Sequence, residues 1–156
     1  MSYLIRRAGE CHLHVVLGGV PVHGSPFVLS VAPSAASATT SSAQGAGLVR
    51  AVVGTEAAFV ITAIDAFGNK RRHGGDRFRA LLTASETEPP PGAGAHKSFT
   101  PKRLLTACEV VDCEDGTYLG LYTPSAAACG QACALHVLLG EAPIRGSPFS
   151  VLVHAS

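Results

Sequence analysis

Apolar and polar residues alternate along much of this chain with the period of two that is typical of half-buried β-strands. In 57–65, for example, the alternation puts Phe59, Ile61 and Ala63 on one face. The stretches that alternate in this way, or that form short apolar runs between turn residues, are 48–53, 57–65, 78–83, 104–111, 117–123, 132–139 and 149–153. No stretch shows a convincing helical period. The pattern therefore predicts an all-β domain, a seven-stranded antiparallel β-sandwich.

A repeated segment indicates that the chain is modular. Gly-Ser-Pro-Phe occurs at 24–27 and again at 146–149, an offset of 122 residues. At this offset Cys11, Leu13, His14, Val15, Leu17, Gly18, Pro21 and Val31 coincide with identical residues at 133, 135, 136, 137, 139, 140, 143 and 153. A period this long suits whole β-domains rather than short helical repeats.

The repeat and the composition divide the chain into three parts. Residues 1–32 predict only the last two strands of one domain, and 43–154 predict a complete one. Between them, 33–42 contain no charge and no large apolar residue, so we expect a flexible linker. Within the complete domain, 86–103 include three consecutive prolines and two nearby glycines, and we interpret this stretch as a mobile insertion.

The first part poses a physical problem, because two strands without the rest of a sandwich leave an apolar face and open edges uncovered. Either this hairpin docks on 43–154 or on another chain, or it is a truncated domain. We expect a tendency to self-associate.

Charge and hydropathy exclude several classes of partner. The net charge of +1, with 15% charged residues, gives no broad positive field, so we predict no binding of nucleic acid. No apolar run approaches the roughly 20 residues of a membrane helix. The start of the chain carries arginines at 6 and 7 instead of the apolar run of a signal peptide, so no secretion signal is predicted.

Cysteine placement favours a reducing compartment. The predicted strand at 132–139 contains Cys133, but the strand at 57–65 has no cysteine to pair with it across the sandwich. The single asparagine, Asn69, is not in a glycosylation sequon. Both features favour an intracellular protein.

No pattern in the sequence predicts catalysis, a metal or a cofactor. Catalytic signatures such as Gly-x-Ser-x-Gly and His-Glu-x-x-His are absent. The residues with metal-binding chemistry are Cys108, Cys113, Cys129, Cys133 and His136, but their spacing fits no zinc signature, and Cys133 is predicted to be a core residue. The basic cluster 70–73 could contact phosphate or an acidic partner, although a solvated loop is the simpler interpretation.

Several short motifs together resemble the filamin repeat, an immunoglobulin-like domain. They are Gly45-Ala46-Gly47-Leu48, Asp65-Ala66-Phe67-Gly68-Asn69, Gly74-Gly75-Asp76, Asp115-Gly116-Thr117-Tyr118, Tyr122-Thr123-Pro124 and Gly146-Ser147-Pro148-Phe149. The resemblance covers 43–154, and 1–32 resemble the end of a preceding repeat. One departure is Gly120, where the family has an apolar residue, and we expect a small void there.

The resemblance implies a site for protein partners. In this family a partner peptide often adds as a strand beside the third strand and lays its side chains over the fourth. By position, Arg79, Leu81 and Thr83 would face the added strand, and Cys108 and Val110 would lie beneath its side chains. The alternative is that the insertion blocks this edge and these are ordinary outward residues.

The resemblance also implies a non-catalytic scaffolding module in a cytoplasmic protein associated with the cytoskeleton. Its partners would be protein or peptide ligands and neighbouring repeats. Contact with actin would be indirect, because the family's separate helical actin-binding domain does not occur in this sequence. The alternatives are the ectodomain of a cell-surface adhesion protein and a substrate-presenting repeat of a multidomain enzyme such as a ubiquitin ligase.

Overall fold

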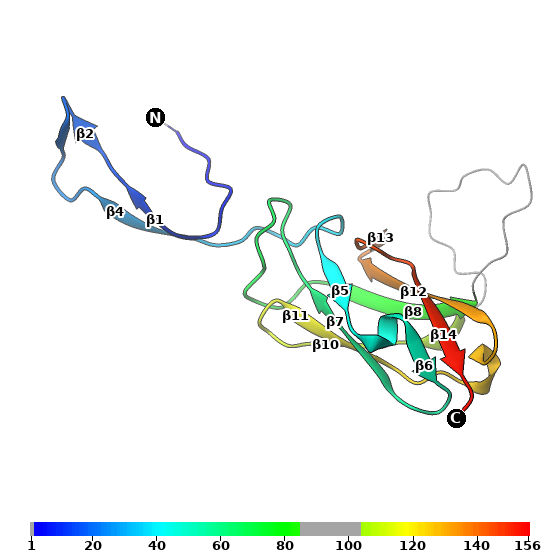
Figure 1. Cartoon of the computed structure of the whole chain (residues 1–156). Helices are drawn as coiled ribbons and strands as arrows, with labels where there is room; N and C mark the ends of the chain where they lie inside the picture. The colour runs from blue at the N-terminus through cyan, green and yellow to red at the C-terminus, as the bar shows by residue number, and fades with distance from the viewer. Residues whose placement is uncertain (1, 85–103) are drawn as a thin grey trace, which may run out of the picture.

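The computed structural model describes residues 2–84 and 104–156, and it shows two β-sheets packed face to face beside a separate hairpin (Figure 1). The first sheet has the strand order β10 (Glu109–Asp112), β11 (Thr117–Tyr122), β7 (Ala57–Thr62) and β5 (Ser42–Gln44). The second has the order β6 (Arg50–Val52), β14 (Phe149–His154), β12 (Ala132–Leu139), β8 (Phe78–Ala84) and β9 (Leu104–Ala107), with β13 (Ala142–Pro143) paired to β12. All pairs are antiparallel except β6 with β14. The predicted insertion 86–103 lies outside the described residues.

The core lies between the two sheets and follows the alternation in the sequence. Every second side chain of β7, β8, β11, β12 and β14 points inward, and the buried members are Phe59, Ile61, Phe78, Ala80, Leu82, Tyr118, Tyr122, Cys133, Leu135, Val137, Val151 and Val153. Cys133 is buried with them, as its place on the strand predicts. These observations confirm the predicted all-β sandwich.

Gly120 does not leave the void expected from the sequence. The ring of Phe59 fills the space above it, and a Cβ built on Gly120 would lie only 2.2 Å from the Phe59 Cζ atom. The two residues are register partners on β11 and β7. The void prediction is therefore wrong, because the aromatic ring on the neighbouring strand occupies the room that a larger side chain would need.

Of the predicted first strand, 48–53, only Arg50–Val52 form a strand, β6, and a further strand, β5, precedes it in the other sheet. β5 pairs with β7 in one sheet, a short 3₁₀ helix η1 (Ala46–Leu48) follows, and β6 pairs with β14 in the other sheet. Gly47 makes this crossing possible, since a Cβ there would lie 2.6 Å from the carbonyl oxygen of Ala58. The Tyr122 hydroxyl fixes the crossing by donating to the Gly47 carbonyl at 2.5 Å.

The segment predicted to be a flexible linker is instead attached to the sandwich over 34–42. Ser41 is fully buried, and its hydroxyl accepts a hydrogen bond from the Ile64 amide at 3.1 Å. Thr40 Oγ1 donates to the Asp65 carbonyl at 2.8 Å, and Ser37 N donates to the Ile64 carbonyl at 2.8 Å. Hydrogen bonds to Ile64 and Asp65, just after β7, thus fix this segment. A count of large apolar residues does not reveal such an attachment.

The hairpin formed by residues 9–31 reproduces the end of the sandwich. It contains β1 (Gly9–Leu13), β2 (Val16–Leu17), β3 (Val20–Pro21) and β4 (Phe27–Val31), with β1 paired to β4. Even single hydrogen bonds recur: Val15 N donates to Ser25 Oγ at 2.9 Å, and Val137 N donates to Ser147 Oγ at 2.9 Å. The sequence repeat is therefore a structural repeat of β12 to β14.

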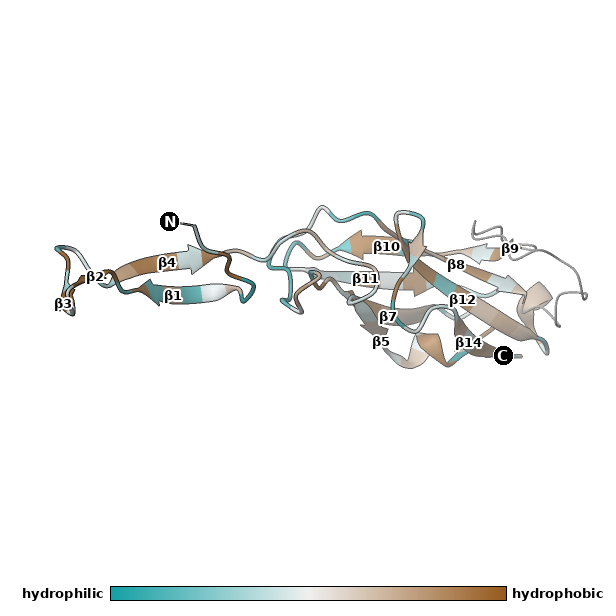
Figure 2. Ribbon diagram, turned by 90° about the horizontal axis from the view of Figure 1, so that it is seen from above, coloured by the Kyte–Doolittle hydropathy of each residue, from teal (hydrophilic) through white to brown (hydrophobic). Residues whose placement is uncertain are grey.

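The hairpin projects from the sandwich, so its apolar residues are not covered as they are in the second copy (Figure 2). Val15 is 38% exposed, whereas Val137 at the equivalent position is 0% exposed. Cys11, Leu13, Leu29 and Val31 are likewise only partly buried. Among the described residues of 2–32, those before β1 meet the sandwich by side-chain hydrogen bonds, at Asn69.

Candidate protein-interaction site

Both sheets end on the same side of the sandwich, at β9 and at β10. β9 pairs with β8 through Leu81–Ala107, Leu82–Thr106 and Thr83–Leu104, with an irregularity between Leu82 and Thr83. β10 pairs with β11 in the other sheet. Within 2–84 and 104–156, no strand pairs with the second edge of either one. An unpaired strand edge offers backbone donors and acceptors to another chain.

One continuous segment supplies both of these strands. The sequence predicts a single strand over 104–111, but the chain changes sheets at Cys108, so this prediction is wrong. Cys108 N donates to the Ala80 carbonyl at 3.1 Å and ends the pairing with β8. The Cys108 side chain then packs against the core, and burial raises the pKa of its thiol to about 12. A single residue thus forms the corner between the two sheet edges.

In the structure, β9 pairs with the edge of β8, the predicted third strand. From the sequence alone, this edge could be either open or blocked. Along Leu81 to Thr83 that edge is paired with the chain's own residues. The segment that pairs there is the first part of the predicted fourth strand, and the insertion that the sequence offered as the block lies outside the described residues. The terminal strand of this sheet is therefore β9.

The three candidate contact residues on β8 differ in exposure. Arg79 is exposed, and its guanidinium lies 3.2 Å from the Glu141 carboxylate. Leu81 is partly buried opposite His136 on β12. Thr83 is only 4% exposed, and its hydroxyl lies 3.1 Å from His136 Nε2. Of the three, Arg79 and Leu81 are accessible from the outer face of the sheet.

The two candidate residues of the fourth strand lie at and after the corner. Cys108 and Val110 are both partly buried and pack against the core cluster. Their neighbours Leu104 and Val111 are more open, with exposed fractions of 56% and 40%. The half-buried apolar side chains between the two sheet edges are Leu105 of β9, Cys108 at the corner and Val110 of β10. Sequence patterning could not identify Leu104 as an edge residue, because it treated 104–111 as one strand.

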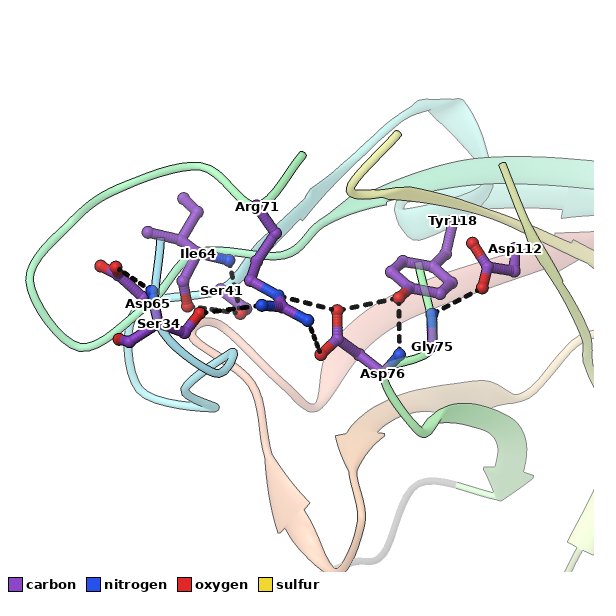
Figure 3. A network of polar contacts seen from close by, with 9 residues as sticks. All are labelled: Ser34, Ser41, Ile64, Asp65, Arg71, Gly75, Asp76, Asp112 and Tyr118. Atoms are coloured by element: carbon purple, nitrogen blue, oxygen red, sulfur yellow. Dashed lines mark hydrogen bonds and ion pairs between the residues drawn. The ribbon is translucent and has the colours of Figure 1, made fainter. Parts of the chain in front are cut away.

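A network of polar side chains, which we call the turn network, holds loops together at one end of the sandwich (Figure 3). Arg71 Nη1 donates to the Ser34 carbonyl at 3.1 Å, and Arg71 Nη2 lies 3.3 Å from Asp76 Oδ1. The Tyr118 hydroxyl donates to Asp76 Oδ2 at 2.9 Å and accepts from the Asp76 amide at 2.8 Å. The network joins the segment before β5 to the loop before β8.

Asp65 is the buried carboxylate of the same region. It accepts hydrogen bonds from the amides of Ser34, Phe67 and Asn69 at 3.0, 2.9 and 2.8 Å. Burial acts to raise the pKa of Asp65, but these hydrogen bonds and those from the Asn69 side chain outweigh it and leave the pKa well below its usual value. The arrangement is structural, because every oxygen of this carboxylate is used to fix the turn after β7.

Two kinds of site are absent from the part of the chain that the structure describes. No group of three or more His, Cys, Asp or Glu side chains among them is arranged to hold a metal ion. In the same ranges, no helix has the length and apolar character needed to cross a membrane.

Comparison with known proteins supports the architecture. The family model for the Filamin/ABP280 repeat matches residues 35–150. The crystal structure of the Lin-41 filamin domain is similar, with 19% sequence identity and a TM-score of 0.54 over 77% of this chain and 97% of that one. FdeC, an adhesin of Escherichia coli, is similar with 19% identity and a TM-score of 0.53, over 96% of this chain but only 41% of that protein. At these identities the two structures show the fold alone.

Proposed function

Because this chain belongs to the Filamin/ABP280 repeat family, we propose that it is a non-catalytic scaffolding module that binds a protein partner by strand addition. Repeats of this family are structural and protein-interaction modules. The observation that carries the proposal is the side of the sandwich where β9 and β10 are both terminal strands. A partner strand that pairs with β9 there can lay its side chains toward β10.

The backbone of β9 has a donor available for this pairing. Successive amides of a strand point to opposite sides, and the Cys108 amide points to Ala80 on β8. The amide of Ala107 therefore points away from β8, toward the open edge. Ala107 itself is exposed, so no side chain of its own covers this donor.

The predicted contact residues have distinct parts in this proposal. Arg79 and Leu81 lie on the outer face of β8, one strand inside the edge, and they can meet long side chains of the partner. Cys108 and Val110 form the half-buried floor at the corner. Thr83 is buried against His136, so we leave it out of the contact surface.

The test is to select binding peptides from a displayed peptide library on the full chain, and to measure their affinity for two variants at one position. Ala107→Pro removes the outward amide, which no β8 residue uses, whereas Ala107→Ser keeps it. We expect a loss of at least tenfold in affinity for the proline variant and little change for the serine variant, since one lost backbone hydrogen bond plus strand distortion costs about 1.5 kcal/mol or more. Equal binding to both variants, with unchanged melting temperatures, would contradict strand addition at β9.

A cytoplasmic, cytoskeleton-associated setting is part of the same proposal, with actin reached only through other parts of a longer protein or through partners. The five free cysteines support it, because a buried thiol such as Cys133 is compatible with a reducing compartment. Alkylation and mass spectrometry of protein isolated from cells should find all five as thiols. A disulfide in that material would favour a cell-surface protein instead.

A further inference from the structure

A pocket of about 400 Å³ lies where the segment before β1 crosses the turn after β7. Its walls include Arg7 from the first part of the chain, and Asn69, Lys70, Arg71 and Arg72 from the second. The basic cluster visible in the sequence thus gains a further arginine from a position more than 60 residues away.

The pocket has an excess of positive charge. Arg71 is engaged in the turn network with Asp76, but Arg7, Lys70 and Arg72 form no ion pair with any residue that the structure describes. Asp115 is the one acidic residue in the wall, and its Oδ1 atom accepts hydrogen bonds from the Thr117 amide and hydroxyl. Three cationic side chains therefore face a single carboxylate that is already hydrogen-bonded within its own turn.

Hydrogen bonds hold the two walls in place. The Ala8 amide donates to Asn69 Oδ1 at 2.9 Å, and Asn69 Nδ2 donates to the Arg6 carbonyl at 2.6 Å. The Arg6 guanidinium lies 5.9 Å from the ring centre of Phe67. Asn69 is itself fixed by Asp65. Arg7, which lies between Arg6 and Ala8, is therefore held beside Lys70 and Arg72 by its neighbours.

We propose that this pocket binds a phosphorylated side chain of a partner protein. A phosphoserine or phosphothreonine brings a charge of about −1.5 to −2 and three acceptor oxygens, and arginine side chains bind such groups through paired hydrogen bonds. A nucleic acid fits less well, because the chain has 12 basic against 11 acidic residues and offers no extended basic stripe. The site is distinct from the β9 edge and does not depend on strand addition.

The test is fluorescence anisotropy with the full chain and a labelled phosphoserine peptide of otherwise neutral sequence, beside its unphosphorylated twin. We expect the phosphorylated form to bind at least tenfold more tightly, and inorganic phosphate to compete with it. Arg7→Ala and Arg72→Ala should each weaken binding about tenfold. Arg50→Ala, an exposed arginine on β6, is the matched control and should have no effect.

Two further variants separate this proposal from others. Asn69→Ala removes the contacts that position Arg7 and should weaken binding as Arg7→Ala does, while Ala107→Pro should leave it unchanged. Equal affinity for the two peptides, or no effect of the Arg7 and Arg72 variants, would overturn the proposal. So would tighter binding of a single-stranded RNA with a steep salt dependence, which would assign the pocket to nucleic acid.

Discussion

At the scale of the residue, the turn after β7 depends on one buried charge. Asp65 is 1% exposed and joins Ser34, which precedes the sandwich, to Phe67 and Asn69 in the turn. A carboxylate that accepts several backbone hydrogen bonds holds its segments more firmly than a neutral acceptor does. The sequence marks this residue only as part of a turn motif, because its partner Ser34 lies 31 residues earlier.

The Asp65 carboxylate should make stability depend on pH. The pKa of Asp65 is lower in the folded state than the ordinary value of about 4. The ionised carboxylate therefore contributes to the free energy of unfolding above about pH 4, and this contribution is lost as the pH falls below that value. We expect Asp65→Asn to lower the free energy of unfolding at pH 7 by on the order of 2 kcal/mol. The difference from the wild type should shrink as the pH falls toward 2.

Urea unfolding at several pH values measures this effect. Glu56→Gln, at an exposed position, is the control and should give a constant, small difference. A difference in the free energy of unfolding between Asp65→Asn and the wild type that is independent of pH would show that the charge of Asp65 is not what stabilises the turn.

Gly120 gives a second prediction at this scale. A methyl group at this position would collide with the Phe59 ring, so Gly120→Ala should destabilise the domain by about 1–3 kcal/mol. Phe59→Leu alone should also destabilise it, but the double variant should lose less than the two single losses combined, since the smaller side chain makes room. Thermal unfolding of the four proteins measures the coupling, and strictly additive losses would show that the ring can move aside.

At the scale of the element, the sequence predicts strands well where one face is buried and poorly where a strand changes sheets. The alternation in β7, β8, β11 and β12 is enough to place their inward side chains, because burial on one face imposes the period of two. It contains no information on pairing partners, so 104–111 is one strand in the pattern and two in the structure. The candidate site depends on this corner, and for that reason its edge could not be located from the sequence.

The hairpin of residues 9–31 should make the chain self-associate through its uncovered face. Leu29 lies on this face, at the position of Val151, which is 2% exposed in the sandwich. Leu29→Asp should shift the chain toward monomer, because burying a carboxylate in an apolar contact is costly. Val28→Asp, on the opposite face of the same strand, should leave association unchanged.

Sedimentation velocity over a range of concentrations distinguishes these outcomes. A compact monomer at every concentration, with Cys11 protected from alkylation, would show that the hairpin covers its apolar face within its own chain.

At the scale of the whole molecule, the sandwich runs along the chain from the segment 34–42 to β14. The hairpin is attached to it by hydrogen bonds between Asn69 and the backbone of Arg6 and Ala8. The sequence is sufficient to find the two units, because Gly-Ser-Pro-Phe recurs at an offset of 122 residues. It cannot find the contact between them, which consists of backbone groups hydrogen-bonded to the Asn69 side chain and of the Arg6 guanidinium over the Phe67 ring. Composition likewise cannot predict that 34–42 is attached to the sandwich, because serine and threonine hydroxyls hold this segment by hydrogen bonds instead of large apolar side chains holding it by burial.

The parallel pairing of β6 with β14 affects how the module would carry mechanical tension. β6 belongs to the first part of the sandwich and β14 is its last strand, and they are joined by the Leu152–Arg50, Val153–Ala51 and His154–Val52 pairs and by hydrogen bonds from Leu152 to Val49 and from Val53 to His154. A pull from the N-terminal side on β6 and from the C-terminal side on β14 acts in opposite directions along two strands that run the same way. These bonds would therefore be loaded in shear and have to break together, so the domain can transmit force along a chain of modules before it opens.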